Sequence, residues 1–203
     1  MLISSKRKRL FIAAMGILAA VAGNSFIRRA DANAGAAGEL AKMFEQDQAD
    51  RKTILTHPQP GQWEIISAHD KQHHDRILEL MRQDKLKSAD DFYYAAMIMQ
   101  HGSDTKDFSL AHIFAMAAAQ KGHKLAPALS ALSFDRLMLS VGQPQIFGSQ
   151  SCSEANAPYK LTEPMQLDLI TDSIRKEFNT QTIPEAKEWL NQLNARRKSI
   201  DPQ

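Results

Sequence analysis

The sequence has few of the features that mark a disulfide scaffold, a β-sheet or a familiar catalytic family. Cys152 is its one cysteine, so no disulfide can form within the chain. Apolar and polar residues do not alternate over any useful length, which argues against strands. The sequence also has no nucleophile elbow, P-loop or dinucleotide-binding glycine pattern. These absences favour an all-α fold and leave the activity unassigned by motif.

An excess of one charge is also missing. The chain has 203 residues, and its 25 basic and 23 acidic residues leave a formal net charge of +2. Much of the basic excess lies in two short clusters, at 6–9 and 196–198. Because no basic stripe is interleaved with aromatic residues, we do not expect nucleic-acid binding. The hydrophobic fraction of 43% is sufficient for one globular domain with a core.

Residues 1–32 have the pattern of a targeting segment. Four basic residues at 6–9 precede an apolar run at 10–22, and the small residues at 30–34 fit a signal-peptide cleavage site. Alternatively, an apolar run at 10–27 approaches the ~18 residues of a membrane anchor, and the basic end would then stay in the cytoplasm. Both alternatives predict export. The body would be periplasmic or secreted, or anchored to the inner membrane through residues 10–27.

After a flexible linker at 33–38, residues 39–203 are expected to form a single α-helical domain. Apolar periodicity and boundary residues predict about seven helices. Their expected ranges are 39–55, 62–82, 88–101, 104–121, 125–141, 164–178 and 184–197. Residues 143–162 show no clear period. The predicted architecture is a helical bundle or a short superhelix.

Small residues in the central helices have a spacing that lets two antiparallel helices pack closely. The small residues include Ala115, Ala118, Ala119, Gly122 and Ala126, and the wider pattern is Gly102, Asp107, Ala111, Ala118, Gly122, His123 and Ala126. This stretch resembles the Sel1-like repeat, a relative of the tetratricopeptide repeat. The resemblance covers about forty residues and one copy, whereas solenoids contain several. It implies a bundle that contains one Sel1-like hairpin able to bind a partner.

A set of polar elements gives a second resemblance. The elements are Asp47-Gln48-Ala49-Asp50-Arg51, Gln100-His101, Asp104, Asp135-Arg136 and the loop Gly142-Gln143-Pro144-Gln145-Ile146-Phe147-Gly148-Ser149-Gln150. Together they resemble a bacterial family of uncharacterised function, in which a threonine usually stands at the position of Ser149. The resemblance implies a shared site and brings no activity with it.

Candidate binding residues come from the same elements. They are Gln100, His101, Asp104, Asp135, Arg136, Gln143, Gln145, Phe147 and Gln150. Asp135 and Arg136 interrupt an apolar helix, where a charge must be paired or reach water. In the 143–150 loop, glycine permits close backbone approach, and glutamine offers both donors and acceptors. The structural alternatives are a salt bridge at Asp135 and Arg136, a helix cap at Asp104, solvent exposure of His101 and a capping role for the loop.

Three residues of the central helices are catalytic candidates. His101, His112 and Asp135 belong to one helix–turn–helix–turn–helix unit, whose concave side could gather an acid–base pair or a metal site. His69 and His73 are weaker metal candidates, since their separation by four residues puts them on one helical face. The structural alternatives are packing for His112 and a solvated polar face for His69 and His73.

The sequence leaves two hypotheses. The first is an exported or membrane-anchored Sel1-like protein that binds an envelope protein, peptide or polar ligand through the hairpin and the 143–150 loop, with no cofactor required. The second is a hydrolase, with or without a metal, that uses His101 or His112 as base and Asp135 as its orienter. The second hypothesis predicts that His101 lies within hydrogen-bond reach of a carboxylate in an open cleft.

Overall fold

The computed structural model describes residues 35–56, 60–153 and 157–200, so the expected targeting segment at 1–32 lies outside the described residues. The helices in these ranges are α2 (Gly35–Thr56), α3 (Gln62–Arg82), α4 (Ala89–Met99), α5 (Thr105–Gln120), α6 (Ala126–Ser140), α7 (Asp172–Glu177) and α8 (Ile183–Ile200). The predicted all-α class is confirmed. Within the same ranges, no helix combines the length and apolar character needed to cross a membrane.

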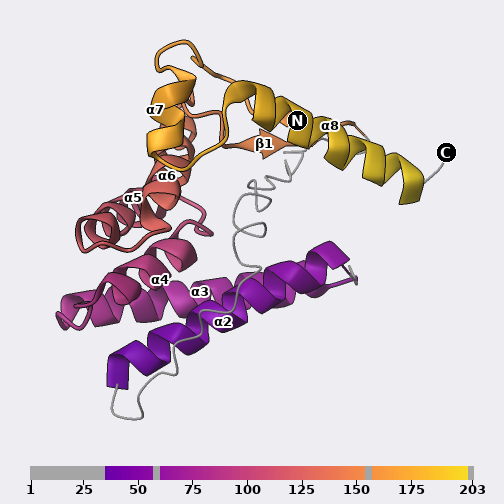
Figure 1. Ribbon diagram of the computed structural model, residues 1–203. Coiled ribbons are helices and arrows are strands. Elements are labelled where there is room, and N and C mark those ends of the chain that lie inside the picture. Colours follow the sequence, from indigo (N-terminus) through magenta and orange to yellow (C-terminus); the bar gives the residue numbers. More distant parts are fainter. Residues whose placement is uncertain (1–34, 57–59, 154–156, 201–203) are drawn as a thin grey trace, which may run out of the picture.

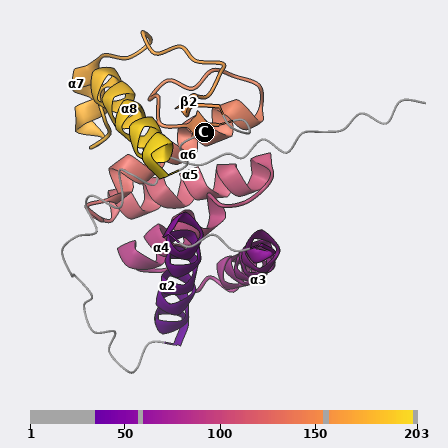
Figure 2. The same cartoon turned by 90° about the vertical axis from the view of Figure 1, so that its right-hand side faces the viewer.

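The helices are stacked in chain order (Figure 1). Helices α2 and α3 lie side by side at one end, α4, α5 and α6 follow, and α7 and α8 lie at the other end. The view turned by 90° shows the same order (Figure 2). The closest pairings are α4 with α5 and α5 with α6. Helix α2 packs more extensively against α4 than against α3, so the packing at this end skips one helix along the chain.

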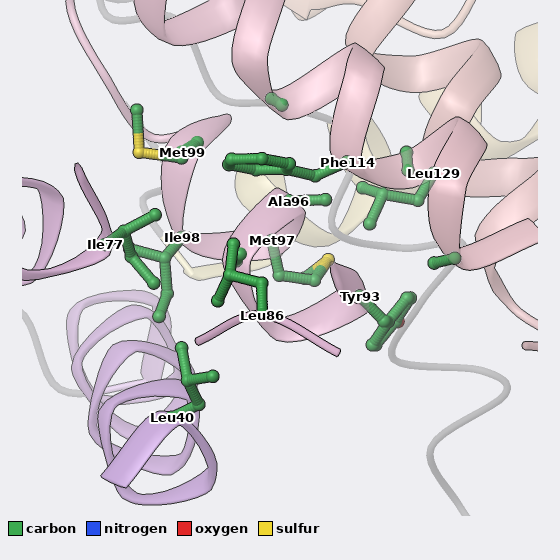
Figure 3. Close-up of a cluster of buried hydrophobic side chains, with 14 of the residues drawn as sticks. Leu40, Ile77, Leu86, Tyr93, Ala96, Met97, Ile98, Met99, Phe114 and Leu129 are labelled. Atoms are coloured by element: carbon green, nitrogen blue, oxygen red, sulfur yellow. The ribbon is translucent and has the colours of Figure 1, made fainter. Parts of the chain in front are cut away.

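The main hydrophobic core runs from α2 to α6 (Figure 3). Its buried side chains include Leu40, Ile77, Leu86, Tyr93, Met97, Ile98, Met99, Phe114 and Leu129. Burying one leucine or phenylalanine side chain contributes roughly 1.5–3 kcal/mol. Ala111, Ala118 and Ala126 are fully buried, which lets the helices that carry them approach closely.

Side-chain caps set the starts of α4 and α5. The Ser88 hydroxyl accepts a hydrogen bond from the Asp91 amide at 3.0 Å, and the Asp91 carboxylate accepts one from the Ser88 amide at 2.8 Å. Asp104 accepts from the Lys106 and Asp107 amides at 2.8 and 3.0 Å. These bonds satisfy amide groups that have no partner within the helix. The predicted cap at Asp104 is confirmed.

Glycines end α5 and α6. Gly122 and Gly142 have φ values of +85° and +74°, a region that other residues rarely adopt. The residues that follow, His123 and Gln143, donate their amides to the carbonyls of Ala118 and Met138 at 3.0 and 2.8 Å. This hydrogen-bond pattern closes a helix by satisfying carbonyls of its last turn.

The predicted helix at 164–178 is wrong over most of its length, because only 172–177 is helical there. The Gln145 amide donates to the Pro164 carbonyl at 3.0 Å, and the Gln166 amide donates to the Gln145 carbonyl at 2.9 Å. These long-range bonds hold the segment against the 143–150 loop and use backbone groups that a helix would need.

The expectation of no strands also needs a small correction. Strand β1 (Ser151–Cys152) pairs antiparallel with β2 (Lys160–Leu161). Two residues a side are too few to show alternating polarity in the sequence. The ribbon connects α6 to the last two helices.

Candidate functional site

The 143–150 loop turns its glutamines inward, with the exception of the exposed Gln143. The side-chain nitrogen of Gln145 donates to the carbonyls of Gln150 and Thr162 at 3.0 and 2.6 Å. The side-chain oxygen of Gln145 accepts from the backbone amide of Gln150 at 2.9 Å. The Gln150 side chain donates to the Leu132 carbonyl at 3.1 Å. Gln145 thus ties the loop to Gln150 and Thr162, and Gln150 ties it to α6, instead of facing a ligand as predicted.

Asp135 anchors the same loop. Its Oδ1 accepts hydrogen bonds from the Ile146 and Phe147 amides at 2.8 and 3.0 Å. Its Oδ2 accepts from the amide and the hydroxyl of Ser149 at 3.0 and 2.8 Å. Burial raises the pKa of Asp135, and these hydrogen bonds act in the opposite direction. The expected pairing of Asp135 with a histidine is therefore corrected, because the loop occupies both of its oxygens.

Arg175 holds the loop from the other side and was missed in the sequence. Its side chain is almost fully buried, with 1% of the residue exposed. Its guanidinium donates to the carbonyls of Phe147, Ile146, Leu167 and Ile170 at 3.2, 2.7, 2.6 and 3.0 Å. Phe147 itself is buried and packs edge-on against Phe178, with ring centres 5.1 Å apart. We call Asp135, Gln145, Gln150 and Arg175 the loop anchor.

A second group of polar residues, which we call the charged cluster, consists of Asp47, Arg51, Asp70, His101 and Arg136. Helix α2 supplies Asp47 and Arg51, which are 1% and 7% exposed. Arg51 donates two hydrogen bonds to Asp70 of α3 at 2.8 and 2.9 Å. His101 follows α4, and Arg136 lies on α6. The cluster thus joins four elements of the stack.

His101 is paired with Asp47. The distance from Nδ1 of His101 to Oδ1 of Asp47 is 2.8 Å, and the His101 side chain is 10% exposed. An ionised carboxylate can only accept, so Nδ1 carries the hydrogen and Nε2 of a neutral ring keeps a lone pair. Asp47 lies within hydrogen-bond reach of His101, as the hydrolase hypothesis predicts, but the His101 side chain is largely buried and does not line the open cleft that the hypothesis also predicts. The alternative of a solvent-exposed His101 is corrected.

The charges around this pair favour an ionised Asp47 and a neutral His101. Burial raises the pKa of Asp47, but His101, Arg51 and Gln48 offset this and hold it below its usual value. Burial lowers the pKa of His101, and the charge of Asp47 acts in the opposite direction. The positive charges of Arg51 and Arg136 reinforce the effect of burial, so the pKa of His101 stays below its usual value. At neutral pH the pair is therefore a carboxylate that accepts from a neutral imidazole.

Arg136 is less well satisfied than any other member of the cluster. Its Nη1 donates to the Gln100 carbonyl at 2.8 Å, and its guanidinium carbon lies 5.8 Å from the centre of the Phe108 ring. Its Nε and Nη2 are buried without an acceptor among the described residues. Burial, together with the charge of Arg51, lowers the pKa of Arg136 to about 10. Arg136 is thus a half-buried cation whose Nε and Nη2 atoms are buried without a counterion among the described residues.

Further buried polar atoms around the cluster lack partners in the described part of the chain. They are Nη1 of Arg51, Nδ1 of His73 and Oε1 of Gln100. Arg51 Nη1 lies 3.6 Å from Asp47, which is too long for a hydrogen bond. Leaving a buried polar group unsatisfied costs about 1–3 kcal/mol. These unsatisfied atoms lie in or beside the charged cluster.

Of the remaining histidine candidates, His69 and His112 have hydrogen-bond partners, whereas Nδ1 of His73 has none among the described residues. His69 Nδ1 lies 2.8 Å from Asp50, and the rings of His69 and His73 are 6.4 Å apart. His112 Nδ1 lies 3.0 Å from the Ser130 carbonyl, so its packing alternative is supported. Across the described ranges, no three side chains of His, Cys, Asp or Glu gather as a metal site would require.

No known protein family, curated protein or solved structure matches this chain.

The sequence had marked Gln100, His101 and Arg136, and the structure brings them together. Asp47 and Arg51 were identified only through a resemblance, and their role in the cluster was not predicted. A usable signal existed, because Asp47 continues the helical stripe of Leu40 and lies one turn before Arg51. A charged residue on an otherwise apolar stripe predicts a buried ionic contact.

Proposed function

We propose that this chain is an exported or membrane-anchored helical protein that binds a peptide or polar ligand of the cell envelope at the charged cluster. One observation carries the proposal: Nε and Nη2 of Arg136 are buried without an acceptor. An uncompensated buried cation costs several kcal/mol. A ligand that accepts from these atoms offsets that cost. The basic and apolar pattern of residues 1–32 supports export.

The proposal moves the binding surface away from the 143–150 loop. The polar groups of Gln145 and Gln150 are used inside the fold, so they have little left to offer a ligand. The Sel1-like hairpin still contributes to the proposed binding site, because Arg136 lies on α6 and His101 lies just before α5. No cofactor is needed for this binding.

A surface hollow lies beside the charged cluster, next to His73. It has a volume of about 400 Å³, and it is lined by Glu39, Met43, Gln72, His73, Asp75, Arg76 and Glu79. His73 is also close enough to Asp47 and Asp70 for their charges to raise its pKa against the larger lowering by burial. The hollow therefore adjoins the charged cluster at His73.

A library of short peptides and polar small molecules tests the proposal by ligand-observed NMR. The full chain, Arg136→Met and Arg197→Met are compared. Arg197 is the matched control, because its guanidinium also stacks on an aromatic ring, 5.5 Å from the centre of Tyr159, but lies on α8. Ligands should bind the unmodified chain and Arg197→Met, and lose binding to Arg136→Met. Undiminished binding by Arg136→Met would contradict the proposal.

The bond between His101 and Asp47 favours a hydrolase as the second candidate. A neutral His101 with a free lone pair on Nε2 can take a proton from water that attacks an ester or amide carbonyl. Envelope-derived peptides are the substrates to assay. His101→Gln should lower the rate by about 10²–10⁴, while His112→Gln should leave it unchanged. An activity that survives His101→Gln would eliminate this candidate.

A further inference from the structure

We infer that the ligand binds through an oxyanion, a carboxylate or a phosphate, which is held by the Nε–Nη2 edge of Arg136. The inference rests on the proposed binding site and names the chemistry of its ligand. It follows from the position of the vacant donors, from a second arginine in the same molecule and from the local charge.

The vacant donors of Arg136 lie on one edge of the guanidinium. The N–H bonds of Nε and Nη2 run nearly parallel, and their spacing matches two oxygens of a carboxylate or phosphate. The third nitrogen, Nη1, is used by the Gln100 carbonyl. The two donors without an acceptor therefore lie together on one edge and can bind the two oxygens of a single oxyanion.

In Arg76 the same Nε–Nη2 edge binds a carboxylate. Its Nε donates to Oε1 of Glu39 at 2.5 Å, and its Nη2 donates to Oε2 of the same carboxylate at 2.8 Å. The two atoms that hold a carboxylate in Arg76 are the two that lack an acceptor in Arg136. A water molecule could fill a single donor, but it would leave the buried charge uncompensated.

The pairing of the surrounding charges leaves Arg136 without a carboxylate of its own. Asp70 already accepts two hydrogen bonds from Arg51, and Asp47 is paired with His101. Arg136 has Arg51 as a charged neighbour, and the charge of Arg51 acts with burial to lower the pKa of Arg136 to about 10. Arg51 and Arg136 are balanced by Asp47 and Asp70 over the cluster as a whole, but neither carboxylate bonds to Arg136, so an oxyanion on its Nε–Nη2 edge would be its direct counterion.

Gln100 adds a second requirement. Its Oε1 is buried without a donor among the described residues, while its backbone carbonyl binds Arg136. A hydroxyl or an amide N–H next to the oxyanion could donate to Oε1. A 2-hydroxy acid, a phosphate ester of a polyol and a free peptide C-terminus all carry such a pair of groups.

The test uses the ¹⁵N-labelled full chain and the Nε–H resonances of its arginines. The Arg136 resonance is assigned by its absence in Arg136→Lys and Arg136→Met. Sodium acetate, sodium lactate and inorganic phosphate are titrated at an ionic strength held constant with sodium chloride. The Arg136 resonance should shift and saturate, and the Arg76 resonance should not, because Glu39 already occupies that edge.

Two further comparisons sharpen the result. Lactate should bind several-fold more tightly than acetate, and Gln100→Met should remove that difference. Arg136→Lys keeps the charge but loses the paired edge, so oxyanion affinity should fall by about tenfold or more. Peptides with free and amidated C-termini, together with glycerol phosphate, then distinguish a peptide source from a phosphate source.

The inference is wrong if the Arg136 resonance does not shift on addition of any of the three anions. It is also wrong if that resonance shows exchange with a bound water alone. If a neutral ligand from the library still requires Arg136, the proposed function stands and the oxyanion inference fails. If nothing binds through Arg136, both are wrong. Circular dichroism of each variant confirms that the helices are intact.

Discussion

The loop anchor and the charged cluster meet at neighbouring residues of α6, Asp135 and Arg136, but they differ in how fully their polar atoms are satisfied. Asp135 accepts four hydrogen bonds from the loop, and the Arg175 guanidinium donates to four backbone carbonyls. Arg136 donates to one carbonyl and has two buried nitrogens without a partner among the described residues.

This difference separates polar residues that stabilise the fold from those available to a ligand. Natural interiors leave few buried polar atoms unsatisfied, so a concentration of them needs an explanation. The loop anchor shows that this fold can satisfy a buried arginine completely. Among the described residues, five of the eight buried side-chain atoms without a partner lie in or beside the charged cluster, and the other three are on Tyr93, His123 and Thr162. This enrichment is a reason to look for function at the cluster.

The largest expected effect is the loss of the loop anchor in Arg175→Met. Four backbone carbonyls, one buried and three part-buried, would lose their donor, and each one left unsatisfied away from water costs about 1–3 kcal/mol. We expect the free energy of unfolding, measured in urea, to fall by at least about 3 kcal/mol. A loss below about 1 kcal/mol would mean that water replaces the guanidinium and that the loop anchor is weaker than its hydrogen bonds indicate.

Asp135→Asn should have the next largest effect. The amide cannot accept at both of its ends, so at least one loop N–H loses its partner and faces another donor. The expected loss of stability in urea is about 2–4 kcal/mol. Asp104→Asn is the matched control, because asparagine caps a helix as well as aspartate does, and its change should stay within about 0.5 kcal/mol. Equal changes at Asp104 and Asp135 would contradict the anchoring role.

Acidification should weaken the fold through the buried histidines. Burial lowers the pKa of His73, His101, His112 and His123 below the usual 6.5. As the pH falls through 6.5, the unfolded chain takes up protons that the folded chain resists, so stability falls with pH by up to about 1.4 kcal/mol per pH unit for each proton. Urea unfolding at pH 7.5 and 5.5 measures this, and His101→Gln should reduce the slope. A fold that is more stable at pH 5.5 would contradict these directions.

The smallest expected change, and the most informative for the comparison, is in Arg136→Met. The substitution removes an uncompensated buried cation and places an apolar chain against Phe108. Stability in urea should therefore stay the same or rise by up to about 1 kcal/mol. A loss as large as that of Arg175→Met would show that Arg136 is also an anchor, and the distinction between the two regions would fail.

Sequence reasoning predicted the helices wherever local signals determine them. Ser88, Asp104, Gly122 and Gly142 mark helix boundaries by short-range chemistry, and those boundaries are found within a few residues of the prediction. The 143–171 segment was not predictable in the same way. Its conformation depends on hydrogen bonds from Asp135 and Arg175, which lie outside the segment and have no local signature.

The candidate site was predictable in part for the same reason. Gln100, His101 and Arg136 stand out as polar residues in apolar surroundings. The partner of His101 is Asp47, which lies 54 residues away on α2, and no local pattern identifies such a contact. Satisfaction of hydrogen bonds also cannot be read from one sequence, so the sequence alone could not separate Asp135 from Arg136.

Asp47 and Arg51 belong to α2, whereas the small-residue hairpin consists of α5 and α6. A fragment that begins at α4 would keep the hairpin. It would lose Asp47, which is the carboxylate partner of His101, and Arg51, which is the cationic neighbour of Arg136. The smallest unit that can carry the site is therefore the whole stack from α2 to α6. Transplanting the hairpin into another helical repeat would transfer its shape and leave its chemistry behind.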